Sequence, residues 1–515
     1  MVNRVKTATV IGLNAYEVSV ETDVTNSLPG MSVVGLPDTS VTEARDRVKS
    51  AIKNSGYSFP SKKVVVNLAP ADLKKVGTNF DLPMAVGILI EEEVLDSEKV
   101  KDYAFIGELS LDGTIRGVSG VLPLVLGLKE AGIKNVIVPL ENAKEAALNG
   151  EVNIFGAGHL VDVVNHFVET KIQPTVVDVK EYLAKQIQQD YTFDFKDVKG
   201  QQKAKKALEI AAAGGHNILM VGSPGSGKTL MAKCFASILP PLELSEALEL
   251  TKIYSICGLL SPDEPLMTKR PFRPVHHTAS ANGIIGGGTN PKPGEITLAN
   301  RGVLFLDEMV EFPRNVLEVL RQPLEDGEIV ISRAQHSIKY PANFMLLGAM
   351  NPCPCGFLGE KEKQCTCSDF QVSRYLARLS GPLLDRIDIQ IDVPRLTPSE
   401  LLATKDAEED SAMIRQRVVK ARAIQFERYK DENILTNSEL TSELIKKYCQ
   451  IDEKSQEILK VAIVKYQLSG RRYDRILKLA RTIADLDGCE NITQIHLMQA
   501  LQYKGLNLTN SWLFV

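Results

Sequence analysis

The spacing of apolar and polar residues over the first 170 positions predicts strands and helices in alternation. Short runs rich in β-branched residues predict strands, and longer amphipathic or apolar runs predict helices. Strands are expected at residues 7–11, 16–20, 31–34, 63–66, 103–106 and 135–138, and helices at 41–55, 80–92 and 121–131. Strands that alternate with helices favour an α/β or α+β fold.

A glycine-rich segment follows the apolar run 217–221 and precedes a predicted helix at 228–239. It consists of Gly222, Ser223, Pro224, Gly225, Ser226, Gly227, Lys228 and Thr229, which fit the pattern G-x-x-x-x-G-K-[ST] of a Walker A loop. The glycines let backbone N–H groups turn toward a polyphosphate, and the N-terminal end of the helix adds positive charge. Lys228 is expected to reach the β- and γ-phosphates, and Thr229 to bind Mg²⁺. The sequence therefore predicts a site for ATP with Mg²⁺.

A second motif supports this prediction. The apolar run 302–306 ends in Asp307 and Glu308, as a Walker B strand does. We expect Asp307 to hold Mg²⁺ through its water shell and Glu308 to polarise the water that attacks the γ-phosphate.

The composition limits the possible functions but does not identify one. The 515 residues carry a formal net charge of −4, so any surface that binds an anion must be local. The first residues lack a long apolar segment, and the apolar run 120–128 is far too short to span a membrane. We expect no membrane partner and a cytoplasmic location.

Four of the eight cysteines crowd into one short stretch. They are Cys353, Cys355, Cys365 and Cys367, in the pattern C-x-C-x₉-C-x-C. Four thiolates satisfy the tetrahedral preference of Zn²⁺, although the usual zinc spacing is C-x₂-C. The alternative is a reduced, metal-free loop.

The region up to residue 170 resembles the proteolytic domain of Lon. The resemblance is carried by Leu-Ser-Leu-Asp-Gly-Thr-Ile-Arg-Gly-Val at 109–118 and Ala-Gly-Ile-Lys-Asn-Val-Ile-Val-Pro at 131–139. Lon uses a serine–lysine dyad. Its serine would fall near Asn79 and its lysine near Leu122, and neither side chain can act as a nucleophile or a base. The resemblance implies a Lon-like α/β domain without peptidase activity.

The region around the Walker motifs resembles an AAA+ P-loop ATPase. Residues 194–201 resemble the segment before the first AAA+ helix, so Val198 and Gly200 would line the adenine pocket. The strand 344–351 ends in Asn351, at the place of sensor 1. Arg386, within Leu-Ser-Gly-Pro-Leu-Leu-Asp-Arg-Ile-Asp at 379–388, matches the arginine finger. Arg471 fits sensor 2, with Arg475 one turn along the same predicted helix.

Two further segments resemble the insertions of the helix-2-insert clade of AAA+ proteins. One is the basic, glycine-rich stretch 270–289, which is expected to interrupt the second core helix. The other is a predicted β-hairpin at 326–341. The resemblance implies that both face a central channel and contact DNA through backbone phosphates. The candidates are Arg270, Arg273, His276, His277, Arg333 and Lys339. The alternative is that they bind neighbouring subunits or face solvent.

Taken end to end, the chain resembles the YifB/ComM family of magnesium-chelatase-like AAA+ ATPases. The most specific match is Asn-Pro-Cys-Pro-Cys-Gly at 351–356. The expected parts are a Lon-like domain (1–170), a linker (171–191), an AAA+ core (192–395), an all-α lid (396–508) and a tail (509–515).

The family implies a hexameric motor that acts on single-stranded or branched DNA, as a helicase or in branch migration during recombination or natural transformation. One alternative is a motor that drives metal insertion into a tetrapyrrole. It is weakened by the N-terminal domain and the cysteine cluster, which the small chelatase motor subunit is expected to lack. Another alternative is a regulatory protein remodeller.

Overall fold

The computed structural model describes residues 3–185, 191–288, 291–332, 337–360, 363–397, 409–432, 434–466 and 468–503. The chain divides into two compact units that interleave in sequence. The first contains residues 1–187, 243–268 and 332–338, and the second contains the rest. The expected boundaries at 170, 191 and 395 stay predictions, and the tail at 509–515 lies outside the described residues.

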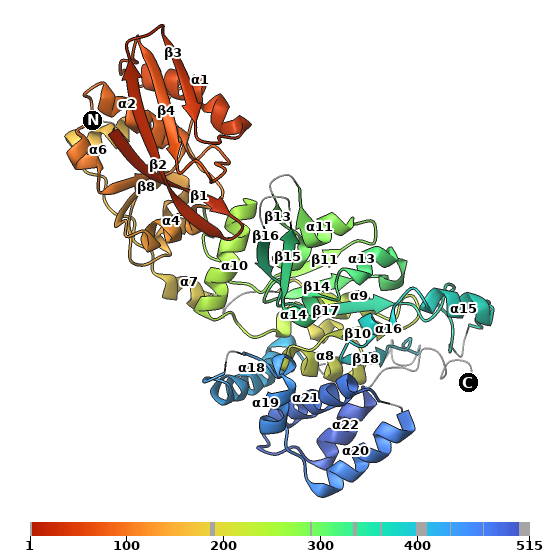
Figure 1. The fold of residues 1–515 in the computed structure, drawn as a ribbon. Coiled ribbons are helices and arrows are strands. Elements are labelled where there is room, and N and C mark those ends of the chain that lie inside the picture. The colour runs from red at the N-terminus through yellow and green to blue at the C-terminus, as the bar shows by residue number, and fades with distance from the viewer. Residues whose placement is uncertain are drawn as a thin grey trace. The chain divides into compact units, whose positions relative to one another are not determined.

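The first unit is built on a seven-stranded sheet of order β3-β4-β2-β1-β5-β8-β9 (Figure 1). Its strands are β1 (Asn3–Ile11), β2 (Asn14–Thr25), β3 (Gly30–Val34), β4 (Lys63–Ala69), β5 (Tyr103–Phe105), β8 (Asn135–Pro139) and β9 (Asn153–Ala157). β1 pairs antiparallel with β2, with Val5 opposite Val20, and β2 pairs antiparallel with β4. The pairs β3–β4, β1–β5, β5–β8 and β8–β9 are parallel. The sheet is therefore mixed, as alternating strands and helices allow.

The first unit also contains α-helices. They are α1 (Thr39–Asn54), α2 (Asp81–Glu91), α3 (Ser97–Val100), α4 (Val121–Glu130), α5 (Ala143–Ala147), α6 (Leu160–Val168), α7 (Val179–Lys185) and α10 (Leu244–Cys257), and the short pair β6 (Glu108–Leu109) and β7 (Ile115–Arg116) lies among them. α1 begins where the Asp38 carboxylate accepts a hydrogen bond from the Val41 N–H at 2.9 Å, an N-cap. α2 is buried from Asp81 to Ile90 and packs on β1 and β2, which explains its nearly continuous apolar sequence.

α10 comes from between the two Walker motifs but packs in the first unit, against α4. The Ser255 hydroxyl donates to the Glu145 carboxylate at 2.5 Å, and Gly120 N–H donates to the Ser255 carbonyl at 2.9 Å. The buried Glu145 also accepts from Leu122 N–H at 2.9 Å. A polar residue on α10 thus satisfies a buried carboxylate that would otherwise be costly.

The second unit contains a five-stranded sheet of order β11-β14-β17-β10-β18. Its strands are β11 (Phe272–Val275), β14 (Val303–Leu306), β17 (Met345–Met350), β10 (Ile218–Val221) and β18 (Ile389–Asp392). Every pairing between neighbours is parallel. Because the strands are parallel, their carboxyl ends meet at one edge of the sheet, where ligands of α/β proteins bind.

The helices around this sheet are α8 (Gln202–Gly214), α9 (Lys228–Phe235), α11 (Ala281–Ile285), α12 (Glu295–Leu298), α13 (Arg314–Glu318), α14 (Pro323–Asp326), α15 (Asp369–Leu376) and α16 (Gly381–Leu384). The prediction that residues 270–275 belong to an insertion in a helix is wrong. Residues 272–275 form β11, an edge strand whose alternation is hidden by two prolines nearby. A small pair of strands, β12 (Gly286–Gly287) and β13 (Lys292–Pro293), does separate α11 from α12. The expected hairpin forms as β15 (Glu328–Ser332) and β16 (Ser337–Pro341).

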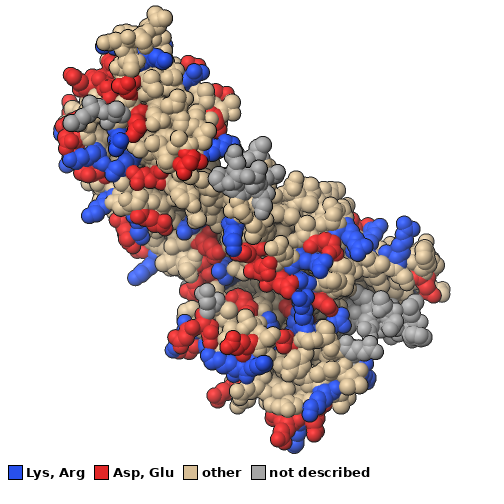
Figure 2. All heavy atoms as spheres, viewed as in Figure 1, with Lys and Arg blue, Asp and Glu red and all other residues tan. Residues whose placement is uncertain are grey.

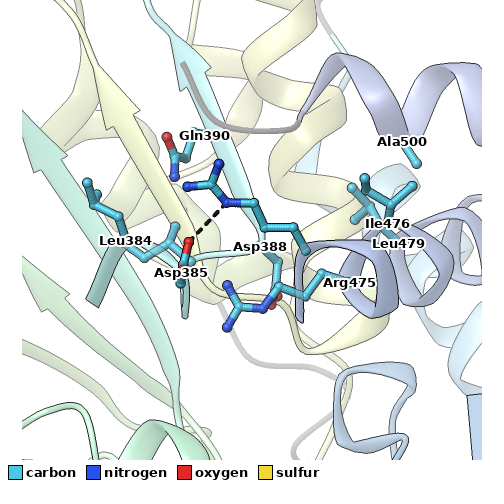
Figure 3. A pocket seen from close by; sticks show the side chains of 10 residues that line it. Leu384, Asp385, Asp388, Gln390, Arg475, Ile476, Leu479 and Ala500 are labelled. Atoms are coloured by element: carbon cyan, nitrogen blue, oxygen red, sulfur yellow. Dashed lines mark hydrogen bonds and ion pairs between the residues drawn. The ribbon is translucent and has the colours of Figure 1, made fainter. Parts of the chain in front are cut away.

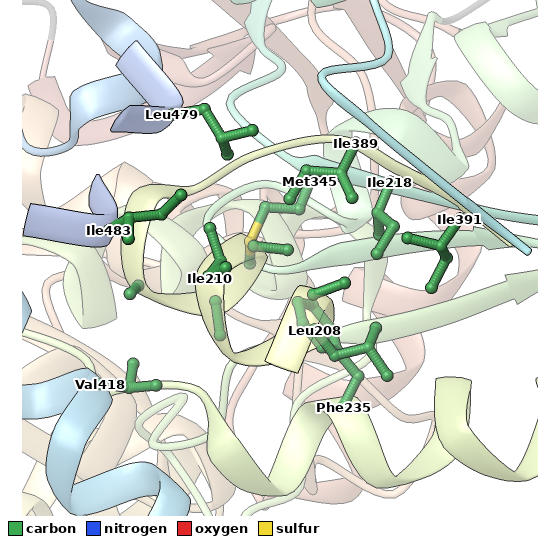
Figure 4. Close-up of a cluster of buried hydrophobic side chains, with 14 of the residues drawn as sticks. Leu208, Ile210, Ile218, Phe235, Met345, Ile389, Ile391, Val418, Leu479 and Ile483 are labelled. Carbon is green, nitrogen blue, oxygen red and sulfur yellow. The ribbon is translucent and has the colours of Figure 1, made fainter. Parts of the chain in front are cut away.

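The C-terminal part of the second unit is helical. It comprises α18 (Ser411–Arg428), α19 (Ser442–Tyr448), α20 (Glu453–Tyr466), α21 (Gly470–Leu486) and α22 (Gln494–Gln502). These helices share one hydrophobic core with the sheet through α8: Leu208 and Ile210 lie between Ile218 and Ile389 of the sheet and Val418 and Ile483 of the lid (Figure 4). These C-terminal helices are therefore packed onto the five-stranded sheet.

Charged side chains of both signs are intermixed over the face shown in Figure 2, which agrees with the net charge of −4. Among the helices of the described ranges, none combines the length and the apolar character that crossing a membrane requires.

Candidate nucleotide-binding site

The glycine-rich loop joins the end of β10 to the start of α9. Gly225 and Gly227 have φ angles of +81° and +91°, which side chains with a Cβ rarely adopt. A Cβ on Gly222 would collide with the carbonyl of Val393, which follows β18. These glycines are thus required by the path of the loop.

Lys228 lies across this loop, with 8% of its surface exposed. Its Nζ donates to the carbonyls of Gly222 at 2.7 Å and Ser223 at 2.9 Å, and lies 3.4 Å from Asn351 Oδ1. Burial lowers the pKa of Lys228, and the carboxylates of Asp307 and Glu308 oppose that shift. The ammonium group is held inside the loop, where a phosphate would be cradled.

The acidic and amide residues arrive on neighbouring strands. Asp307 follows β14, and its Oδ2 accepts from Thr229 Oγ1 at 2.8 Å. Asn351 follows β17, which lies between β14 and β10. The structure therefore brings Lys228, Thr229, Asp307 and Asn351 to one edge of the sheet, as the motifs predict.

Glu308 lies beside Asp307 in a left-handed backbone conformation, with φ of +49°. Such a conformation is unfavourable for a residue with a Cβ and is commonly found at functional sites. Its carboxylate is more than half exposed and lies 3.6 Å from His277 Nδ1. The side chain is thus available to orient a water molecule.

The segment expected to form the adenine pocket is in contact with residues that reach the phosphate loop. Val198 is buried, and Gly200 has φ of +56° with its Cα facing Leu396. The neighbouring Gln201 donates to the Pro394 carbonyl at 2.6 Å. Arg395 donates from Nε and one Nη to the Pro224 carbonyl at 3.1 and 2.9 Å. Arg395 was not a predicted site residue, because a lone arginine after a strand carries no motif.

Arg386 and Arg471 lie at the opposite edge of the sheet. Asn217, just before β10, donates from Nδ2 to the Arg386 carbonyl at 2.9 Å, whereas the phosphate loop follows β10. The strand between them, Ile218–Val221, spans about 13 Å at ~3.3 Å per residue. As an arginine finger, Arg386 was expected to act on the nucleotide of a neighbouring subunit. Within a single chain, the structure places Arg386 and Arg471 at the other end of β10 from the phosphate loop.

Both arginines are held by one acidic residue. Arg386 donates from one Nη to Glu325 Oε2, and Arg471 donates to Glu325 Oε1 at 3.1 Å. Glu325 lies in α14, two residues before Gly327, whose carbonyl accepts from the N–H of Ala342, between β16 and β17. This contact also places the pair at the amino ends of the strands.

A small pocket at this edge is lined by further charged residues (Figure 3). Arg472 pairs with Asp385 at 2.9 Å, and Arg475 pairs with Asp388 at 3.3 Å. Burial by itself would raise the pKa of Asp388, but the His216 ring, whose Nδ1 lies 3.4 Å from Asp388 Oδ2, and the charge of Arg475 lower it to about 2. His216 was not predicted, because a lone histidine after a helix gives no signal in sequence.

The residues expected to contact DNA have different surroundings. Arg270 donates to the carbonyls of Pro240, Arg301 and Pro241 at 2.8, 2.7 and 3.1 Å, and Arg273 forms a two-point ion pair with Glu295 at 2.7 and 2.8 Å. His276 stacks on His277, with ring centroids 4.1 Å apart. Lys339 on β16 is exposed and pairs with Glu328 at 2.9 Å. Arg333 lies outside the described residues.

The four clustered cysteines converge. Their sulfur atoms all lie within 4.8 Å of one another, and three of the separations are 3.3, 3.7 and 3.5 Å. A regular tetrahedron with metal–sulfur bonds of about 2.3 Å requires sulfur–sulfur distances of about 3.8 Å. The thiols therefore already have nearly the geometry of a four-thiolate metal site.

The positions matched to the Lon dyad are both buried. The Asn79 side chain donates to the Ala8 carbonyl at 3.0 Å, and Leu122 packs in the apolar core. Both side chains lie in the interior of the unit, and neither offers a nucleophile. The likeness of this unit to Lon stays a prediction.

Comparison with known proteins agrees with this geometry. The family described as "Magnesium chelatase, subunit ChlI" matches residues 194–401, and its C-terminal family matches residues 408–504. The competence protein ComM of Haemophilus influenzae is 44% identical over 499 residues, which cover 96% of each chain. The chain belongs to the YifB/ComM family of magnesium-chelatase-like proteins. It is accordingly an AAA+ ATPase by family, with ATP and Mg²⁺ as the cofactors of that family.

Two further comparisons define the extent of the likeness. YifB of Escherichia coli is 43% identical over 504 residues, covering 98% of this chain and 97% of YifB. The magnesium-chelatase 38 kDa subunit of Rhodobacter capsulatus is 29% identical over 177 residues, covering 31% of this chain and 50% of that subunit. A family described as "Subunit ChlI of Mg-chelatase" also matches residues 20–142. The presence of the N-terminal region is therefore no argument against a chelatase role.

Proposed function

We propose that the protein hydrolyses ATP as a ring of identical subunits, a hexamer, and uses the energy to move single-stranded or branched DNA, as in branch migration. The observation that supports a ring is the position of the two arginines. Arg386 and Arg471 lie at the amino ends of the strands, whereas Lys228 lies at the carboxyl ends. The backbone of Arg386 adjoins the start of β10 and the phosphate-binding loop follows its end, so the length of the strand, about 13 Å, lies between the two. A second copy would bring them to the nucleotide.

The surroundings of Arg386 suit that role. Its Nε has no hydrogen-bond partner among the residues that the structure describes. Burial, together with the charges of Arg471, Arg321 and Arg475, lowers the pKa of Arg386. At Arg386, the charges of these three arginines outweigh that of Glu318, which favours the approach of an anion such as a neighbour's γ-phosphate. An arginine fork can meet two oxygens of that group.

DNA as the substrate is supported by the full-length similarity to a protein named for competence. Arg270 and Arg273 already hold backbone and Glu295, so they are poor candidates for a DNA contact. The hairpin β15–β16, with exposed Lys339, is the better candidate. Contacts of this kind would be to phosphates, so binding should tolerate any sequence and weaken steeply as salt rises.

The test is the response of the ATPase and of strand separation to forked DNA. Lys339→Ala should weaken DNA binding and slow unwinding while sparing ATPase activity without DNA, and it should reduce the salt dependence of binding. Lys430→Ala is a matched control, because Lys430 is likewise exposed and paired with a glutamate, Glu427. A wild-type protein that neither binds nor unwinds forked DNA would overturn the DNA assignment.

A chelatase-type motor is the second candidate, because all three family matches carry the name of a chelatase subunit. The same ATPase assay separates the two. Stimulation by a porphyrin-bearing partner, with indifference to DNA, would favour metal insertion into a tetrapyrrole.

We also propose that Cys353, Cys355, Cys365 and Cys367 bind Zn²⁺. The carrying observation is the convergence of the four sulfur atoms within 4.8 Å. Metal analysis of protein purified without chelators should find one zinc per chain, which a Cys365→Ser/Cys367→Ser variant should lose. Protein free of metal that binds none on titration would contradict the proposal.

A further inference from the structure

The loop that carries the cysteines also touches the phosphate-binding loop. Gly356, between the second and third cysteines, has φ of +84°, and a Cβ placed on it would lie 2.6 Å from Pro224 Cδ. Glu360 accepts a hydrogen bond from the Ser223 hydroxyl. Pro224 and Ser223 belong to the Walker A loop, so the two loops are in van der Waals and polar contact.

Further contacts join the same two loops. The Arg395 guanidinium holds the Pro224 carbonyl and lies 5.6 Å from the centre of the Phe357 ring. Within the cysteine loop itself, the Lys363 ammonium lies 3.9 Å from the centre of that ring. Cys353 is fully buried, two residues after Asn351, whose amide oxygen faces Lys228. Asn351, Gly356 and Glu360 thus face the nucleotide loop, and Cys353 and Cys355 in the same stretch supply two of the four sulfur atoms.

We propose that Zn²⁺ bound by the four cysteines braces the phosphate-binding loop, so that zinc and ATP each increase the affinity for the other. The inference rests on the proposed zinc site. The stretch 351–368 has no helix or strand among its described residues, so metal–sulfur bonds would supply most of its order. An ordered loop keeps Gly356 and Glu360 against Pro224 and Ser223. Loss of the metal would disorder the loop, break that contact and alter the shape of the ATP site.

The first experiment measures the affinity for a fluorescent ATP analogue with Mg²⁺ before and after zinc is removed from the full-length protein. Stripped protein should bind the analogue roughly fivefold or more weakly, and added ZnCl₂ should restore binding. Because coupling between two binding sites is reciprocal, the analogue should strengthen zinc retention against a competing chelator by the same factor. This second measurement uses the folded, zinc-loaded protein, so it does not depend on the stability of the stripped form.

A variant separates the brace from the metal. Glu360→Ala should retain one zinc per chain but reduce the mutual effect of zinc and nucleotide. Glu427→Ala, which removes an exposed carboxylate on the lid helix α18, should leave that effect unchanged. If zinc binds and the affinity for the analogue is the same with and without it, the brace is wrong and the zinc site stands. If zinc does not bind, both fail, and the ATPase assignment is unaffected.

Discussion

We expect Lys228 and Glu308 to have separate roles at the nucleotide. The Lys228 ammonium is buried inside the phosphate loop, whereas the Glu308 carboxylate is largely exposed beside it. Lys228→Ala should therefore lose ATP binding, and Glu308→Gln should bind ATP normally while hydrolysing it about 100-fold more slowly or worse, since a catalytic base contributes at least that much. Binding of a fluorescent analogue and phosphate release measure the two effects. Hydrolysis at the parent rate in the Glu308 variant would refute its assignment.

Asp388 gives a prediction about stability and pH. Its pKa is about 2 in the folded protein, below the usual ~3.9, because His216 and Arg475 stabilise the carboxylate. The carboxylate then stabilises the fold by about 2–3 kcal/mol above pH ~4, and this contribution declines as the pH falls toward 2. Urea unfolding of the wild type and Asp388→Asn should show a difference that is largest at pH 6 and smaller at pH 3. A difference that does not change with pH would contradict the assignment.

The sequence predicted which residues lie close together where a motif fixes their position, and the chemistry assigned to them stays a prediction. Lys228, Thr229, Asp307 and Asn351 follow directly from strand ends, and parallel pairing then brings them together. The roles of Arg386 and Arg471 stay predictions, and the distance of their side chains from Lys228 within one chain could not be read from the sequence. That distance depends on which end of the strand each residue adjoins.

At the scale of elements, β11 shows where sequence patterns fail. The sequence of these four residues, which includes Pro274, was predicted to be an irregular insertion. They instead pair with β14 at the edge of the sheet, where a proline is tolerated because its absent N–H need not pair with a second strand. The strands of the first unit were predicted to within a few residues, because their β-branched runs are distinct. β9 and α6 were not predicted. The sequence also could not assign α10 to the first unit, because α10 contacts α4, which is far from it along the chain.

The position of Arg270 beside β11 predicts a structural role. Its guanidinium donates to three backbone carbonyls that would otherwise lack those partners, and hydrogen bonds to a charged group contribute about 1.5–3 kcal/mol each. Arg270→Ala should lower the free energy of unfolding by roughly 3 kcal/mol, whereas Lys339→Ala should change it by less than about 0.5 kcal/mol. Chemical denaturation measures both. An Arg270 variant of unchanged stability that no longer binds DNA would restore Arg270 as a DNA contact.

At the scale of the whole molecule, the two edges of the ATPase sheet have complementary roles. One edge carries the groups that bind ATP, and the other carries arginines whose partner in the chain is an exposed glutamate. A ring in which the arginine edge of each subunit meets the nucleotide edge of the next would complete every site. The proposed ring makes a second copy necessary for activity, so single subunits should hydrolyse ATP slowly.

The most direct test mixes two inactive variants. The Lys228→Ala variant lacks the phosphate-binding lysine but keeps Arg386, whereas the Arg386→Ala variant keeps Lys228 but lacks the arginine. A mixture should therefore recover part of the ATPase activity, at sites where Lys228 of one variant meets Arg386 of the other. Glu308→Gln mixed with Lys228→Ala is the control, because both changes damage the nucleotide edge and the mixture should stay inactive. Recovery in the first mixture alone is the result that we expect. An inactive first mixture, or a monomer with full activity, would contradict the account.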